Sequence, residues 1–209
     1  MLLRARYLAG DAALGRDFLD MVRPFVYRKY LDFNSIDEIR TMKTKIDETF
    51  KKDDIKRGYG GIREIEFFVH ALQLIYGGKE PLLREKSTLK SLHHLLQKNL
   101  IGHGDFSLLN DNYRFLRRLE HRLQQLNDLQ THTLPSGDAE QTILAKKMGF
   151  SDKPSFLSEL ERRRATVRKI YDSLFREREL KDLEVNRETA LLLSEDLSDS
   201  ELGDFLARY

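Results

Sequence analysis

Apolar residues recur at intervals of three and four along almost the whole chain, and this spacing limits the possible folds more than any other feature. Residues spaced in this way lie on one face of an α-helix. The longest such segment is Phe106–Gln130, whose apolar stripe consists of Leu109, Tyr113, Leu116, Leu119, Leu123 and Leu126. No segment bounded by turns alternates apolar and polar residues as a half-buried strand would. We therefore predict an all-α protein, a multi-helix bundle of six or more helices with Phe106–Gln130 as its longest, central element.

Shorter helices are predicted on both sides of this segment. The first eleven residues are helix-prone, without a capping residue before them. Asn34 or Ser35 is expected to begin one helix and Ser87 another, since such residues favour the N-cap position. The other expected helices span 14–22, ending near Pro24, then 62–76, 136–148 and 153–179, with weaker segments at 186–193 and 198–207. The spacing places Ile65, Phe68, Leu72, Leu116 and Leu119 in the core.

Composition excludes several classes of protein. The chain has 209 residues, enough for one large domain or two small ones, and no cysteine. Disulfide scaffolds, thiol nucleophiles and zinc–thiolate sites are thereby excluded. No apolar run approaches the roughly 20 residues that span a bilayer, and the N-terminal residues lack a signal-peptide pattern. We expect a soluble, cytoplasmic protein with no membrane partner.

Charge is nearly balanced but unevenly distributed. The net charge is +2, whereas residues 177–209 carry ten acidic and four basic side chains. A mildly basic body with an acidic tail does not indicate a nucleic-acid-binding protein, which shows a stronger and more clustered basic surface. One basic ridge, made of Arg114, Arg117, Arg118 and Arg122, could contact a phosphorylated partner or be an ordinary solvated helix face.

A basic, glycine-rich turn leads directly into an apolar helix between Ile55 and Tyr76. Lys56 and Arg57 precede Gly58, Gly60 and Gly61. Glycines let the backbone take positive φ and let another surface approach closely, and the first-turn N–H groups and the helix dipole favour an anion. The turn is therefore either a loop that faces a phosphate or an active site, or an ordinary lead-in to a buried helix.

The residues alone predict neither a metal site nor a catalytic group. Glu64 and Glu66 are two residues apart on a helix and point in different directions, so they cannot jointly hold a metal. The six histidines have no metal-ligand spacing, and no serine-nucleophile motif is present.

Three separated motifs carry a resemblance to a known family. They are RPFVYRKYLDF (23–33), IKRGYGGIREIEFFVHALQLIYGG (55–78) and YRFLRRLEHRLQQLNDLQTHTLP (113–135). Together they resemble the bifunctional glutamine-synthetase adenylyltransferase/adenylyl-removing enzymes, which carry two nucleotidyltransferase modules, each followed by a helical domain. The resemblance covers about residues 1–176, and the pairing of IREIEF with the first motif is typical of the adenylyl-removing half. PII uridylyltransferases share a related glycine turn but fit the residues after it, and the THTLP segment, less well.

This resemblance implies that the chain is a fragment of a larger enzyme. Residues 1–60 would be the last helices of a truncated nucleotidyltransferase module with a connector, 61–179 the helical bundle, and 180–209 an acidic helical tail. The family's glycine–serine turn and Asp-x-Asp pair, which hold two magnesium ions, are missing from the chain. Mg²⁺ and ATP/ADP are thus expected as cofactors of the full-length enzyme only. The isolated chain, with no catalytic residue and no metal ligand of its own, is expected to be inactive.

The resemblance also implies a function and a set of site residues. By analogy, the enzyme uses phosphate to remove AMP from an adenylylated tyrosine of glutamine synthetase, and it also attaches AMP from ATP. The expected partners are glutamine synthetase and a PII signalling protein. The nucleotide or phosphate cleft would be lined by Arg4, Arg6, Lys56, Gly60, Gly61, Arg63 and Glu64. Two alternatives remain, a docking module that binds glutamine synthetase or PII without chemistry of its own, and a plain helical scaffold.

Overall fold

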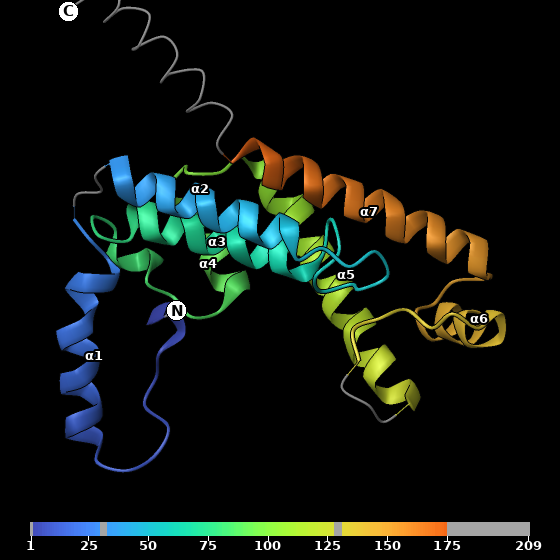
Figure 1. Cartoon of the computed structure of the whole chain (residues 1–209), viewed down its shortest axis with the longest axis horizontal. Helices are drawn as coiled ribbons and strands as arrows, with labels where there is room; N and C mark the ends of the chain where they lie inside the picture. Colours follow the sequence, from blue (N-terminus) through green and yellow to red (C-terminus); the bar gives the residue numbers. More distant parts are fainter. Residues whose placement is uncertain (1, 30–32, 128–130, 175–209) are drawn as a thin grey trace, which may run out of the picture. The chain divides into compact units, whose positions relative to one another are not determined.

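The structure is a computed structural model that describes residues 2–29, 33–127 and 131–174 (Figure 1). Within these ranges the chain forms seven α-helices, two 3-10 helices and no β-strand, which confirms the predicted all-α class. The elements are η1 (Leu2–Arg4), α1 (Ala12–Val26), α2 (Phe33–Glu48), α3 (Ile62–Tyr76), η2 (Pro81–Leu83), α4 (Thr88–Gln97), α5 (His103–Asn127), α6 (Asp138–Lys147) and α7 (Lys153–Ser173). The helices predicted at 186–193 and 198–207 lie outside the described residues.

The core is built around α3, which contacts α2, α4 and α5. Figure 1 shows α2 lying along α3. All five residues predicted for the core, Ile65, Phe68, Leu72, Leu116 and Leu119, are buried, as expected for apolar positions at helical spacing. α5 is the longest described helix, as predicted, but it begins at His103, because the N–H of Phe106 already donates to the carbonyl of Gly102.

α7 joins this core through an aromatic contact. The rings of Phe67 on α3 and Tyr171 on α7 meet edge to face, with their centroids 5.7 Å apart. The ammonium of Lys43 on α2 lies 4.4 Å from the centre of the same Tyr171 ring. Such aromatic and cation–π contacts add to the apolar burial of the rings. Three helices, α2, α3 and α7, therefore meet at one tyrosine.

The N-terminal part differs from the sequence prediction. The first residues form only a 3-10 turn, because Gly10 takes a φ of 99° and Asp11 caps α1 by accepting the N–H groups of Ala13 and Leu14. α1 does not end before Pro24 but continues to Val26. Pro24 lies in the last turn, where the loss of its N–H removes a single helical hydrogen bond.

The described residues up to Tyr171 form one compact unit. The division at residues 60 and 179 that the sequence suggested stays a prediction. Among the residues that the structure describes, no helix is both long and apolar enough to cross a membrane.

Candidate functional site

The glycine loop between α2 and α3 satisfies its own backbone. The first N–H groups of α3 donate to carbonyls of the loop, from Ile62 to Ile55 at 3.1 Å, from Arg63 to Lys56 at 3.0 Å and from Glu64 to Gly61 at 3.2 Å. The anion at this helix start is Glu64 itself, whose carboxylate accepts the N–H of Gly60 at 3.0 Å, in a variant of the capping box. These N–H groups are therefore not available to an external anion, which agrees with the second interpretation of the turn, an ordinary lead-in to a buried helix.

The THTLP segment supports the loop from the other side. Asp54 is buried, and its Oδ1 accepts the N–H groups of Lys56 and Arg57, each at 2.8 Å, which fixes the turn. The N–H of Ile55 donates to the carbonyl of His132 at 2.8 Å, within an isolated antiparallel bridge between Asp54 and Thr133. Two motifs that are far apart in the sequence thus form one local structure.

Two of the glycines are required because α7 lies against the loop. Gly60 has a φ of 65°, and a Cβ there would lie 2.0 Å from the carbonyl oxygen of Arg164. A Cβ on Gly58 would lie 2.2 Å from the Arg164 guanidinium. Positive φ and close approach are thus confirmed for Gly60, but the approaching surface is the chain's own helix. Gly61 differs, since its φ is −85° and only nearby loop carbonyls limit a side chain there.

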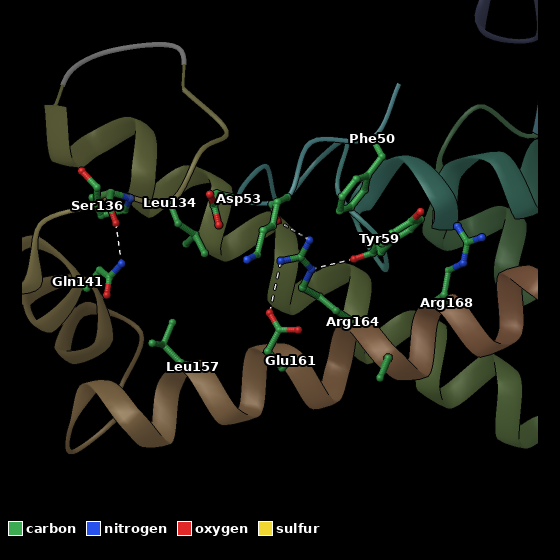
Figure 2. A pocket seen from close by; sticks show the side chains of 13 residues that line it. Phe50, Asp53, Tyr59, Leu134, Ser136, Gln141, Leu157, Glu161, Arg164 and Arg168 are labelled. Carbon is green, nitrogen blue, oxygen red and sulfur yellow. Dashed lines mark hydrogen bonds and ion pairs between the residues drawn. The ribbon is translucent and has the colours of Figure 1, made fainter. Parts of the chain in front are cut away.

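Arg164 connects α7 to the loop by hydrogen bonds. Its side chain is buried, and it donates to the carbonyl of Tyr59 at 2.7 Å and to that of Lys52 at 3.1 Å (Figure 2). No sequence pattern singled out Arg164. The signal that could have found it is an arginine in register with the apolar stripe of Leu160, Val167 and Tyr171, where a charged side chain needs partners.

Arg168, one turn further along α7, binds two carboxylates. Its guanidinium donates to Glu64 at 2.9 Å and to Asp47 at 2.6 Å. Burial raises the pKa of Glu64, and the hydrogen bond from Arg168 opposes that rise. Burial lowers the pKa of Arg168, but the two carboxylates outweigh it and leave that pKa above its ordinary value. Glu64 is therefore engaged in an internal ion pair and does not face a cleft.

A half-open pocket of about 950 Å³ lies between the loop, the segment after the THTLP residues and α7 (Figure 2). It is lined by Phe50, Lys52, Asp53, Tyr59, Leu134, Pro135, Ser136, Gln141, Leu157, Glu161, Arg164, Ala165 and Arg168. The rings of Phe50 and Tyr59 stack 3.8 Å apart at its rim. None of the residues expected to line the nucleotide cleft lines this pocket, although Arg168 connects it to Glu64.

Arg4 and Arg63 lie at separate places. Arg4 donates to His70 at 3.1 Å and lies 3.4 Å from Glu66, which diverges from Glu64 on α3 as predicted. Arg63 donates to the hydroxyl of Thr49 at 3.2 Å, and among the described residues it has no carboxylate partner.

The next group of expected residues is exposed on the surface. Arg6 is exposed, and Arg118 is an exposed residue of α5. On the ridge, Arg114 donates to Asn110 and Arg122 to Gln125, both within α5. Five of the expected cleft residues thus lie together in the glycine loop and the first turn of α3, whereas Arg4 and Arg6 lie elsewhere.

A second group of charges connects the loop with the basic ridge of α5. Glu120 is 2% exposed, and its Oε1 lies 3.9 Å from the ammonium of Lys56 and 3.0 Å from Nδ1 of His132. The His132 contact lacks hydrogen-bond geometry, since that nitrogen has no hydrogen-bond partner. Arg117 hydrogen-bonds to the other oxygen of Glu120. The predicted loop candidate Lys56 and ridge candidate Arg117 are therefore neighbours.

Within the described ranges, no group of three or more His, Asp or Glu side chains is placed to hold a metal ion. The residues present thus do not fit a Mg²⁺ site, and no chemical step is assigned through that ion.

The chain is similar in sequence to several known proteins. The family described as GlnD PII-uridylyltransferase matches residues 35–175. The chain is 50% identical over 154 residues to a bifunctional glutamine synthetase adenylyltransferase/adenylyl-removing enzyme of Stenotrophomonas maltophilia, covering 72% of this chain and 16% of that protein. Proteins of the same name match at 47% identity from Xanthomonas campestris (79% and 18% covered) and at 41% from Methylococcus capsulatus (84% and 19%). The chain thus spans less than a fifth of the length of these relatives.

Proposed function

The chain belongs to the GlnD PII-uridylyltransferase family, and from that premise we propose that it is part of a nucleotidyltransferase that regulates glutamine synthetase. In this proposal the full-length enzyme attaches AMP to glutamine synthetase and removes it again, and this chain is a helical region of the adenylyl-removing half. The observation that carries the proposal is the identity of 41–50% to relatives named for both activities.

Within that enzyme, the chain would brace the nucleotide cleft from one side. The glycine loop is held by its own hydrogen bonds and by Arg164, so it is a rigid edge for a neighbouring module to meet. Mg²⁺ and ATP or ADP would be bound mainly by the rest of the enzyme. This supporting role agrees with charged side chains, such as Glu64 and Arg168, that pair with each other inside the chain.

Arg63 is the residue best placed to face the nucleotide. Its neighbours Glu64, Arg164 and Arg168 are all engaged in internal pairs, whereas Arg63 has the Thr49 hydroxyl as its partner. A guanidinium without a carboxylate partner retains its charge and most of its donors for phosphate oxygens. The basic group would offset charge on the nucleotide as the bond to AMP breaks.

The test is Arg63→Ala in the full-length enzyme, assayed by ADP formation from adenylylated glutamine synthetase and phosphate. Loss of one charge-stabilising donor should lower the rate by roughly 10²–10³-fold. Arg162→Ala is the control, because Arg162 is an exposed helix arginine on α7 whose partner is Glu159 of the same helix. A folded Arg63→Ala enzyme with the wild-type rate would reject the cleft role.

A docking role is the second candidate, and one observation favours it. Leu14, Phe18, Met21 and Phe25 recur at helical spacing on α1, and their exposed fractions are 70%, 46%, 68% and 70%. An apolar stripe of this kind on a helix surface often marks a protein-binding face. In this alternative, α1 docks glutamine synthetase, and a PII protein is the second partner to test.

Surface plasmon resonance with purified glutamine synthetase, and separately with PII, tests the stripe. Leu14→Gln together with Met21→Gln should weaken docking at least about tenfold, since apolar anchors dominate such contacts. Leu8→Gln is the control, because Leu8 is 76% exposed but lies outside α1. Unchanged binding of both proteins to the double variant would exclude α1 as the docking face.

A further inference from the structure

The basic side chains around Glu120 come from three separate segments of the chain. Lys56 belongs to the glycine loop, Arg117 to α5 and His132 to the segment after α5. All three approach one carboxylate that is almost completely buried. A single carboxylate neutralises one positive charge, so Lys56 and Arg117 together leave the cluster with a net positive charge.

The outer sides of these cations still carry hydrogen-bond donors. Arg117 uses Nη1 on Glu120, whereas a guanidinium has five N–H donors. The Lys56 ammonium lies 3.9 Å from Glu120, close enough for an ion pair but too far for a hydrogen bond. Both side chains are 38% exposed, while Glu120 lies beneath them. The cluster therefore presents donors to solvent and keeps its acceptor inside.

Lys56 and Arg117 both approach Glu120, so their remaining donors suit a ligand with several acceptor oxygens. Arginine forms planar, paired hydrogen bonds with phosphate, and lysine binds phosphate as a point charge. His121 lies one helical turn beyond Arg117 and is exposed, so it extends the same face of α5. A phosphoryl group offers three strong acceptor oxygens to these donors, whereas a carboxylate offers two.

We propose that Lys56 and Arg117, positioned by the buried Glu120, form a binding site for a phosphoryl group. The group belongs either to a free phosphate or nucleotide or to a phosphorylated side chain of another protein. The inference rests on the charges and free donors of the cluster and holds whether or not Arg63 faces the nucleotide cleft.

Isothermal titration calorimetry of the whole 209-residue chain at low ionic strength tests this site. The probes are inorganic phosphate, AMP and a phosphotyrosine peptide, with the unphosphorylated peptide as the blank. For each probe that binds, Lys56→Gln and Arg117→Gln should each weaken binding by roughly 10- to 100-fold, the scale of one charged hydrogen bond. Lys56→Arg should restore most of the affinity.

Arg162→Gln is the matched control, because Arg162 is an exposed helix arginine on α7 that hydrogen-bonds to Glu159 and not to Glu120. Its affinity should stay within about twofold of wild type if the site is local. Binding of phosphate or AMP would identify a small-molecule ligand, and binding of the phosphopeptide alone would identify a protein partner. An equal loss in Arg162→Gln, or no binding of any probe to the folded wild type, would overturn the proposal. Circular dichroism of each variant confirms folding.

Discussion

Glu64 and Glu66 show how two neighbouring carboxylates acquire different partners. They are two residues apart on α3, and each lies beside an arginine, Arg168 on α7 for Glu64 and Arg4 in η1 for Glu66. Their divergence follows from the helical period and was predictable. Their partners were not, because both arginines are distant in the sequence and reach α3 only through tertiary packing.

His70 should make stability depend on pH in a specific window. Burial first, and then the positive charge of Arg4, lower the pKa of His70 from 6.5 to about 4, while Glu66 opposes this shift. Between these values the folded protein binds fewer protons than the unfolded chain, so stability falls as pH decreases. From pH 7 to pH 4 the wild type should lose up to about 3 kcal/mol more than His70→Gln.

Urea unfolding of both proteins at several pH values measures this difference. The amide side chain introduced by His70→Gln does not titrate, and its oxygen could still accept the hydrogen bond that Arg4 donates. Parallel stability curves for the two proteins would contradict a neutral, buried His70.

The glycine loop and α7 pack against each other. Arg164 holds the loop carbonyls, and the glycines leave room for the α7 backbone. The sequence indicated a loop that some surface approaches, and α7 is that surface. A motif interpreted as a ligand loop therefore has a structural explanation in this part of the chain.

Gly60→Ala tests the contact between the loop and α7. The backbone of Gly60 is left-handed, and the new Cβ would overlap the Arg164 carbonyl. We expect a loss of at least about 2 kcal/mol in the free energy of unfolding. Gly102→Ala is the control, because a Cβ there meets nothing within 4 Å and its φ is not left-handed. Equal stability of the two variants would show that α7 does not lie against Gly60.

Leu116→Ala tests the contact of α5 with the core. Leu116 is fully buried, and Leu108 on the same helix is 42% exposed. Leu116→Ala should cost roughly 2–5 kcal/mol, since it removes packing and leaves a cavity. Leu108→Ala should change the free energy of unfolding by less than about 1 kcal/mol. Chemical denaturation compares the two variants. An unchanged midpoint for Leu116→Ala would mean that Leu116 does not lie on the buried face of α5.

At the scale of the whole molecule, the chain is a small part of its relatives. It spans 16–19% of their lengths, and its sequence lacks the Asp-x-Asp pair that the resemblance implies for catalysis. One network of charges, Arg168 with Asp47 and Glu64, connects α7 with α2 and α3. These features agree with a supporting region that acts together with other parts of a longer protein.

The isolated chain is therefore expected to be catalytically silent. Purified chain, incubated with adenylylated glutamine synthetase, phosphate and Mg²⁺, should form no ADP above the protein-free blank, because no group of three or more His, Asp or Glu side chains among the described residues is placed to hold a metal ion. The full-length enzyme, assayed in parallel, is the positive control. ADP release by the isolated chain would place catalytic groups within these residues.

Local features of the sequence were enough to predict the all-α class, the core faces of α3 and α5, the helix start at Ser87 and the helix end near residue 148. These features follow from the helical period and the preferences of capping residues, which act over a few positions. The similarity to the adenylyltransferase/adenylyl-removing enzymes was also predictable, because the three motifs keep their order along the chain. The extent of α1 was missed because Pro24 is tolerated in a last turn.

The pairing of charges, in contrast, depends on tertiary packing. Arg164 and Arg168 bind the glycine loop and Glu64, and Glu120 brings Lys56 beside Arg117. These contacts join segments that are far apart in the sequence, and their geometry depends on how whole helices pack. Helical spacing predicts the direction of a side chain from its own axis, whereas a partner across the core is set by the crossing of two helices. Of the two interpretations that the sequence left open for the glycine loop, this packing favours the structural one, in which the loop contacts α7.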